Sequence, residues 1–227
     1  MNNQNLARTG LVATTMALFL TACGGGGSSK TPPQPAEQTG SLYGQLQGTT
    51  ATTVRPMAQI VEGPEFVATV NAQQQFSLAL PPASVVEGKY NSDLIALSDV
   101  FTGCTLTPAT DVKVMLLNSL QTNTNQELKA ISYLNGAKTY TYWWFANKTA
   151  TTTVNGSCLA GTFNNRSLSL VHGWNKITWT TNGQSVDLNA QAPTSDRQVW
   201  TPTSLEGQTV HADFDLPWRQ LDKYKTR

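Results

Sequence analysis

Three Asn-Gly dipeptides divide the second half of this chain into short segments that favour strands. They are Asn135-Gly136, Asn155-Gly156 and Asn182-Gly183. Asn-Gly favours the type I′ turn of a β-hairpin, because both central residues of that turn need positive φ. The flanking segments are rich in Thr, Val, Tyr and Trp, which favour strands. We therefore predict three antiparallel hairpins, whose strands span 127–134 and 139–146, 149–154 and 157–163, and 176–181 and 184–188.

The first half alternates polar and apolar residues with a period of two, which is also typical of strands. Phe76, Leu78 and Leu80 would share one face of such a strand. Glu62-Gly63-Pro64-Glu65 has turn residues between two of the predicted strands. Residues 94–100 and 206–213 are ambiguous. Further strands are predicted at 41–48, 58–61, 66–70, 75–82, 112–120 and 167–171.

We predict an all-β fold built from two small antiparallel β-sandwich modules. The first module spans residues 41–106, the second spans 107–203, and 204–227 form a C-terminal tail that is either a short helix or loose. The boundary falls near residues 104–110. One continuous, larger sandwich is the alternative.

Some residues of the first module carry a family resemblance. Gly44, Leu46 and Gly48, with the closing run Phe76-x-Leu78-x-Leu80-Pro81, resemble the carboxypeptidase-regulatory-like or transthyretin-like β-sandwich modules common in bacterial envelope lipoproteins. Gln73-Gln74 stands where such modules often have Asp-Gly. The resemblance covers roughly 60 residues and implies a β-sandwich.

The first 22 residues read as a secretory signal peptide. Arg8 supplies the positive charge, residues 11–20 the apolar region, and Ala22 the small residue before a cleavage site. Leu20-Thr21-Ala22-Cys23 resembles the lipobox of bacterial lipoproteins, whose leader is cut before a cysteine that carries lipid. The resemblance implies diacylglycerol and palmitate-type chains at Cys23, and an extracytoplasmic place in the cell envelope. Gly24 after the cysteine implies the outer membrane in a cell with two membranes.

Residues 23–40 are rich in Gly, Ser and Pro and are predicted to be a tether between the anchor and the body. Removing residues 1–22 takes away Arg8 and leaves 14 basic and 14 acidic side chains. A neutral chain has no electrostatic reason to bind nucleic acid. We therefore expect the partners to be the membrane, through lipid on Cys23, and an envelope protein or a glycan.

Cys104 and Cys158 are the two cysteines that remain beyond Cys23. In an exported chain an even pair predicts a disulfide. It would close a loop of roughly 53 residues and stabilise the fold by about 4 kcal/mol on the chain-entropy model. The alternative adds His172 and His211 to make a zinc site, but the four residues lack the short paired spacings of such sites. We predict no metal and no cofactor.

The sequence lacks the usual signatures of an enzyme. It has no Gly-x-Ser-x-Gly nucleophile elbow, no phosphate-binding loop and no dinucleotide-binding glycine motif. We therefore predict no catalytic residue and a non-catalytic binding or assembly role. The enzyme alternative requires a cleft that unites His172 or His211 with Asp187, Asp213 or Asp215.

One aromatic run, Tyr140-Thr141-Tyr142-Trp143-Trp144-Phe145, is the densest candidate for recognition. Tyr and Trp offer flat contact area that suits sugar rings, pigments or partner proteins. We favour packing of these rings in the core and between modules. The alternative is a carbohydrate- or small-ligand-binding lipoprotein that uses Tyr140, Tyr142, Trp143 and Trp144 as its platform.

Overall fold

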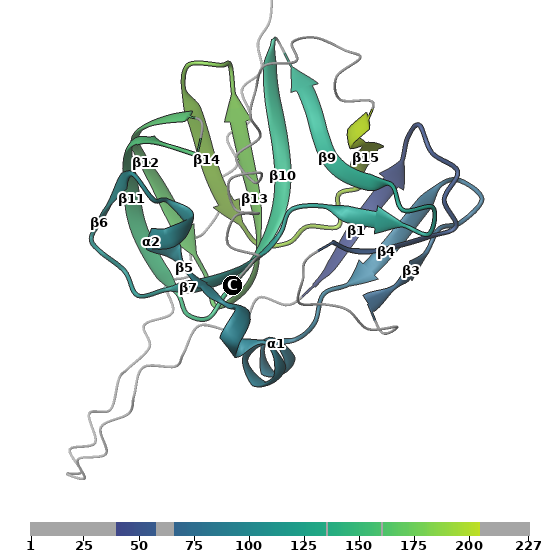
Figure 1. Ribbon diagram of the computed structural model, residues 1–227, viewed down its shortest axis with the longest axis horizontal. Helices are drawn as coiled ribbons and strands as arrows, with labels where there is room; N and C mark the ends of the chain where they lie inside the picture. The colour runs from purple at the N-terminus through teal and green to yellow at the C-terminus, as the bar shows by residue number, and fades with distance from the viewer. Residues whose placement is uncertain (1–39, 58–65, 135, 160, 205–227) are drawn as a thin grey trace, which may run out of the picture. The chain divides into compact units, whose positions relative to one another are not determined.

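The computed structural model describes residues 40–57, 66–134, 136–159 and 161–204, which build an all-β body (Figure 1). The predicted all-β class is therefore confirmed. Cys23, the strand expected at 58–61 and the C-terminal residues 205–227 lie outside the described residues.

Strands β1 (Ser41–Leu46) and β4 (Gln75–Ala79) form an antiparallel pair. Gly44 lies opposite Phe76 in this pair, and the Phe76 ring crosses β1 at that point. A Cβ atom on Gly44 would lie 2.2 Å from Phe76 Cζ and 2.7 Å from Trp200 Cδ1. Glycine is therefore needed here so that two aromatic rings can approach the backbone.

Two shorter strands, β2 (Thr53–Pro56) and β3 (Ala68–Thr69), pair with each other in antiparallel fashion. β3 lies within the predicted strand 66–70, whereas β2 was not predicted. Pro56 closes β2 and Val54 is buried, so only a brief alternation marks this strand.

The chain between β4 and the strand at Lys113–Leu117 contains three short helices and two short strands. Pro82 is the N-cap residue of the first helix, in extended conformation, and the helix buries Ala83 and Val86 three positions apart. We did not predict this helix, because Val85 and Val86 favour strands. The elements here are α1 (Ala83–Lys89), the 3₁₀ helix η2 (Asn91–Asp93), β5 (Ile95–Ala96), α2 (Leu97–Val100) and β6 (Cys104–Thr107).

The first predicted hairpin is confirmed. β9 (Glu127–Leu134) and β10 (Ala137–Ala146) are antiparallel, and Leu134 lies opposite Ala137, so the connection has two residues. Gly136 has a φ of 78°, as the predicted turn requires. The predicted strand 112–120 is two strands, β7 (Lys113–Leu117) and β8 (Leu120–Thr122).

The predicted hairpin at Asn155-Gly156 is wrong. Both residues lie inside one strand, β11 (Ala150–Cys158), which pairs with β12 (Gly161–Leu170). The register of this pair shifts between Val154 and Gly156, so the positive φ of Gly156, 122°, serves a β-bulge instead of a turn. The chain reverses after Cys158, which lies opposite Gly161.

The third predicted hairpin is confirmed with a longer loop. Thr181, at the end of β13 (Gly173–Thr181), lies opposite Val186, at the start of β14 (Val186–Gln191). Asn182 Oδ1 accepts hydrogen bonds from the backbone N–H groups of Gln184 and Ser185, and Gly183 has a φ of 92°. The last strands are β13 (Gly173–Thr181), β14 (Val186–Gln191) and β15 (Gln198–Pro202).

Strands from both predicted modules share one hydrogen-bonded sheet. Its main path runs β14-β13-β10-β9-β15-β1-β4, and β12-β11-β6 form a separate three-stranded sheet. β1 is parallel to β15, with Gly44 opposite Gln198 and Leu46 opposite Trp200. The predicted division between residues 106 and 107 is therefore not confirmed.

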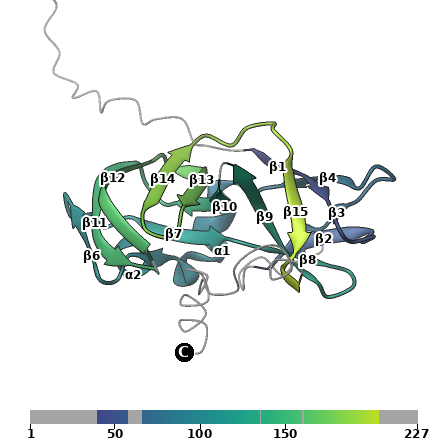
Figure 2. The ribbon, with the colours of Figure 1, turned by 90° about the horizontal axis from the view of Figure 1, so that it is seen from above.

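Two clusters of buried side chains occupy opposite faces of the large sheet. On β10, Trp143 and Phe145 belong to the first cluster, whereas Tyr142 and Trp144 belong to the second. In Figures 1 and 2 the three-stranded sheet lies on the side of β13 and β14, and β1, β3 and β4 lie on the other. The first cluster also holds Leu42, Phe76, Leu78 and Trp200, and the second also holds Phe101, Phe163, Leu168 and Trp179.

Candidate functional site

The aromatic run of β10 faces both hydrophobic clusters. On one face, Trp143 stacks on Trp200 with ring centroids 5.6 Å apart, and Phe145 meets Trp174 edge to face at 5.8 Å. On the other face, Trp144 meets Phe101 edge to face at 6.2 Å. Each ring of this strand therefore has aromatic neighbours of its own within the protein.

The burial of these rings bears on both interpretations of the run. The residues proposed as a ligand platform, Tyr140, Tyr142, Trp143 and Trp144, are each at most 3% exposed. Trp144 Nε1 also donates a hydrogen bond to Asn118 Oδ1 at 3.3 Å. These side chains form core in the described structure and present no surface to a ligand.

His172 links the turn before β13 to helix α1. Its Nε2 atom lies 2.9 Å from Glu87 Oε1, and its ring packs edge to face on Phe145 with centroids 6.1 Å apart. The backbone N–H of His172 donates to Thr149 Oγ1. Its side chain is 14% exposed. A histidine so placed joins two segments of the body.

The acidic residues of the enzyme hypothesis do not gather around His172 in the described residues. Asp187 pairs with Arg166, whose guanidinium nitrogen lies 2.7 Å from its carboxylate. His211, Asp213 and Asp215 lie outside the described residues. His172 and Asp187, the two members that can be located, thus have different partners.

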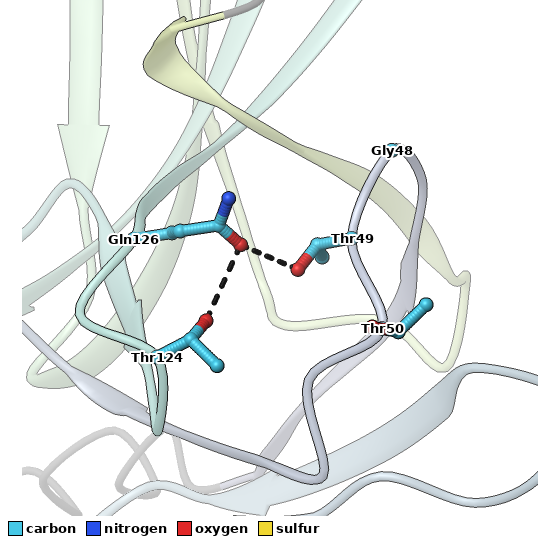
Figure 3. Close-up of a pocket in the computed structure, with 5 residues that line it drawn as sticks. All are labelled: Gly48, Thr49, Thr50, Thr124 and Gln126. Carbon is cyan, nitrogen blue, oxygen red and sulfur yellow. Dashed lines mark hydrogen bonds between the residues drawn. The ribbon is translucent and has the colours of Figure 1, made fainter.

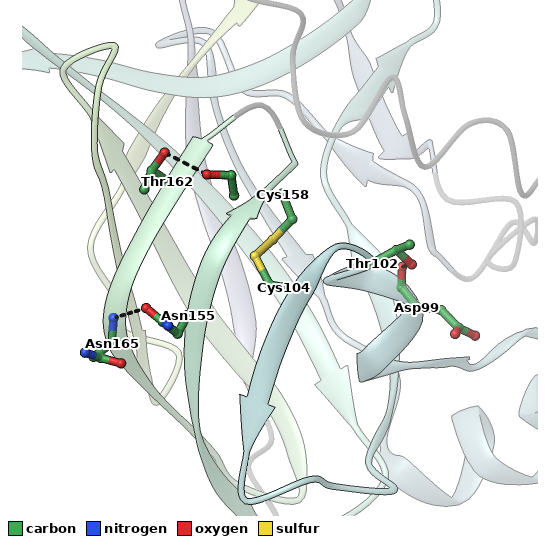
Figure 4. The surroundings of a disulfide bond; sticks show 8 residues. Asp99, Thr102, Cys104, Asn155, Cys158, Thr162 and Asn165 are labelled. Atoms are coloured by element: carbon green, nitrogen blue, oxygen red, sulfur yellow. Dashed lines mark hydrogen bonds between the residues drawn. A yellow bond between two sulfur atoms is a disulfide. The ribbon is translucent and has the colours of Figure 1, made fainter.

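Cys104 in β6 and Cys158 at the end of β11 form a disulfide (Figure 4), as predicted. Their Cα atoms are 5.5 Å apart. Gly156 lies beside the bridge, because a Cβ atom there would be 3.4 Å from Cys104 Cα. Asn155 Oδ1 accepts a hydrogen bond from Asn165 N–H across the bulge (Figure 4). The bulge and the bridge therefore form one local unit.

An open depression of about 670 Å³ lies between the loop after β1 and the turn from β8 to β9 (Figure 3). Two of its side chains meet at Gln126, whose Oε1 accepts hydrogen bonds from Thr49 Oγ1 at 2.5 Å and from Thr124 Oγ1 at 3.4 Å. The lining is neutral and polar. The described residues that line it are Gly48, Thr49, Thr50, Thr124 and Gln126.

The two walls of the depression are tied together. Asn123 Oδ1 accepts hydrogen bonds from the backbone N–H groups of Thr52 and Thr53, which follow the lining residue Thr50 in the chain. Thr122 Oγ1 accepts from the N–H groups of Thr124 and Gln126 and so fixes the turn. The lining residues are therefore held in place before any ligand arrives.

This depression was not predicted from the sequence. Its signal is two runs of small polar residues, Gly48-Thr49-Thr50 and the run from Thr122 to Gln126. Each run alone indicates an ordinary turn. They lie more than 70 residues apart in the chain, so only the pairing of the strands brings them together.

Comparison with known proteins identifies no relative: the chain matches no protein-family model, no curated protein sequence and no solved structure. Within the described ranges, no His, Cys, Asp and Glu side chains form a group of three or more that could hold a metal ion. In the same part of the chain, no helix is long and apolar enough to cross a membrane.

Proposed function

We propose that this protein is a lipid-anchored, extracytoplasmic component of a bacterial cell envelope, with a β-body that binds or assembles other molecules without catalysis. The observation that carries the proposal is Leu20-Thr21-Ala22-Cys23 after an apolar run, followed by a Gly/Ser/Pro-rich stretch. Two acyl chains on Cys23 suffice for stable anchoring, since each buried CH₂ contributes about 0.8 kcal/mol.

The disulfide supports an exported location. Disulfides persist in oxidising compartments and are rare in the cytosol. The bridge between Cys104 and Cys158 lies within the body, so it is a structural element of the folded chain. The balance of 14 basic and 14 acidic side chains after residue 22 fits a partner that is not nucleic acid.

Two further observations support a non-catalytic body of the proposed module type. His172 is engaged by Glu87 and Phe145, while Asp187 is engaged by Arg166. In addition, Gly44 and Phe76, which carry the resemblance to carboxypeptidase-regulatory-like modules, lie opposite each other in the β1–β4 pair. Both pairings have structural roles.

Metabolic labelling tests the anchor. Cells that express the full chain are fed an alkyne analogue of palmitate, and the protein is isolated and coupled to a fluorophore. We expect label on the wild type and none on Cys23→Ala. Ser28→Ala, in the tether, should be labelled like the wild type. An unlabelled wild type that stays in the aqueous phase with its leader uncut would contradict the proposal.

Site-specific photocrosslinking tests the binding or assembly role. The exposed apolar residues Val67 and Val199, each 42% exposed, are suitable positions for the crosslinker. We expect a discrete adduct from the anchored protein that is lost in the Cys23→Ala background, because anchoring brings the body to its partner. A smear that is identical in both backgrounds, or no adduct at either position, would count against the role.

A further inference from the structure

We propose that the depression between the loop after β1 and the β8–β9 turn binds a neutral saccharide through hydrogen bonds. The site is defined by Gly48, Thr49, Thr50, Thr124 and Gln126. This proposal names a ligand class for the binding role proposed above, and it rests on that role. It differs from the aromatic platform considered for β10, whose rings are buried.

The chemistry of the lining selects the class of ligand. A threonine hydroxyl both donates and accepts a hydrogen bond, and a glutamine amide offers one acceptor and two donor hydrogens. The hydroxyl groups of a sugar also donate and accept, so they match this lining. Among the residues that the structure describes, no charged side chain lines the depression to offset the lost hydration of a phosphate or carboxylate. The lining therefore favours an uncharged polyol over a charged ligand.

The Gln126 amide is oriented to donate. Its Oε1 already accepts from Thr49 and Thr124, and Figure 3 shows its Nε2 pointing away from both threonine hydroxyls. No hydrogen bond from Nε2 to another described residue is present. Two N–H donors of Gln126 thus remain for a ligand oxygen.

The walls are preorganised for binding. Gly48 has a φ of 76°, which lets the loop after β1 turn toward the β8–β9 turn without strain. Asn123 Oδ1 then holds the backbone of Thr52 and Thr53 against that turn. Because the walls are already ordered, a ligand does not have to fix them and loses less affinity to ordering.

The experiment uses the full-length protein, extracted from membranes in a detergent without a sugar headgroup, such as lauryldimethylamine oxide. The probes are maltotetraose, cellotetraose, chitotetraose and mannotetraose, with tetragalacturonate as the charged comparison. Saturation-transfer NMR detects binding and calorimetry measures the dissociation constant. We expect at least one neutral tetrasaccharide to bind, and tetragalacturonate to bind at least tenfold more weakly.

Three variants locate the site. Gln126→Glu keeps the acceptor for Thr49 and Thr124 but removes both N–H donors, so we expect the affinity to fall about tenfold. Thr124→Val keeps the shape and removes a hydroxyl, and we expect a smaller loss, about threefold. Gln47→Glu adds the same charge at an exposed residue next to the site, outside the lining, and should leave binding unchanged.

Three results would overturn the proposal: no neutral tetrasaccharide binds, only tetragalacturonate binds, or Gln126→Glu binds like the wild type. The labelling of Cys23 does not depend on any sugar. A failure here therefore leaves the anchoring proposal untouched, and a failure to label Cys23 leaves this site to be judged on its own binding data.

Discussion

Two glycines of this protein, Gly44 and Gly88, differ in the space that surrounds them. Gly44 lies under Phe76 and Trp200 and has no room for a side chain. Gly88, inside helix α1, has no atom within 4 Å of the position where a Cβ would be. The same substitution should therefore change stability in opposite directions at these two residues.

We expect Gly44→Ala to lower the free energy of unfolding by about 1–3 kcal/mol, because the new methyl group overpacks the contact with Phe76. Gly88→Ala should raise it by about 0.5–1 kcal/mol, since alanine favours helix more than glycine does. Urea unfolding followed by circular dichroism measures both. Equal effects of the same sign would contradict the packing described at Gly44.

The Asp111–Lys148 ion pair gives a prediction about pH. The hydrogen bond from the Lys148 side chain holds the pKa of Asp111 below its usual value, with a further contribution from an Asp111 backbone hydrogen bond and from the charge of Lys148. A lowered folded-state pKa stabilises the fold above the unfolded-state pKa, and this contribution is lost as the pH falls through the folded-state value. The Asp111 side chain is 86% exposed, so the effect on stability is small.

NMR titration of the Asp111 carboxyl carbon tests this directly. In the wild type we expect a pKa below that of an ordinary aspartate, and in Lys148→Met a pKa that rises toward the ordinary value. Lys113→Met, a lysine that does not contribute to the shift, should leave the pKa of Asp111 unchanged. An ordinary Asp111 pKa in the wild type would show that the ion pair does not form.

At the scale of elements, β10 explains why an aromatic run can look like a binding surface. Alternate residues of a strand point to opposite faces. When one face is solvated, only every second residue is apolar. Here both faces are covered, so consecutive residues from Tyr140 to Phe145 are buried, including Thr141 at 4% exposure. The sequence predicts such a strand, but it does not reveal what covers the second face.

The variant Trp144→Ala tests the burial of this strand. We expect a loss of about 3–5 kcal/mol in the free energy of unfolding, because the change leaves a large cavity beside Phe101. Val199→Ala, on a side chain that is 42% exposed, should change it by less than about 0.5 kcal/mol. Urea unfolding provides the values. A cost for Trp144→Ala as small as that for Val199→Ala would mean that the ring is at the surface.

Local signals predicted some elements and failed at others for identifiable reasons. β9 and β10 were predicted well, because Asn135-Gly136 joins two strands that are adjacent in sequence and pair directly with each other. Asn155-Gly156 carries the same signal but lies in a bulge, beside Cys104 of a distant strand. Helix α1 was missed because it contains β-branched residues, which favour strands. It begins after Pro82 and is held by the burial of Val86, a tertiary contact that the sequence does not reveal.

At the scale of the whole molecule, the disulfide joins segments from the two predicted modules. Cys104 belongs to the first and Cys158 to the second, and the bridge links two of the three strands of the smaller sheet. The all-β class and this bridge could be predicted from composition and cysteine count. The shared large sheet and the polar depression could not, since both depend on pairings between residues far apart in sequence.

Removal of the bridge should destabilise the protein. We expect Cys104→Ala/Cys158→Ala to lower the free energy of unfolding by about 2–4 kcal/mol, because the unfolded chain regains the freedom of a long loop. Dithiothreitol should lower the urea midpoint of the wild type to about that of the double variant. It should not shift the midpoint of the double variant. A wild type that is insensitive to the reductant would contradict a stabilising role for the bridge.

The parallel pairing of β1 with β15 has a consequence for how the chain reaches its native state. These strands are about 150 residues apart in sequence, and β1 lies between β15 and β4. During synthesis from the N-terminus, β1 is therefore made long before its neighbour β15. Such high contact order slows folding and leaves an open strand edge to be shielded meanwhile. The edge of β1 that pairs with β15 therefore stays without its partner until residues 198–202 have been synthesised.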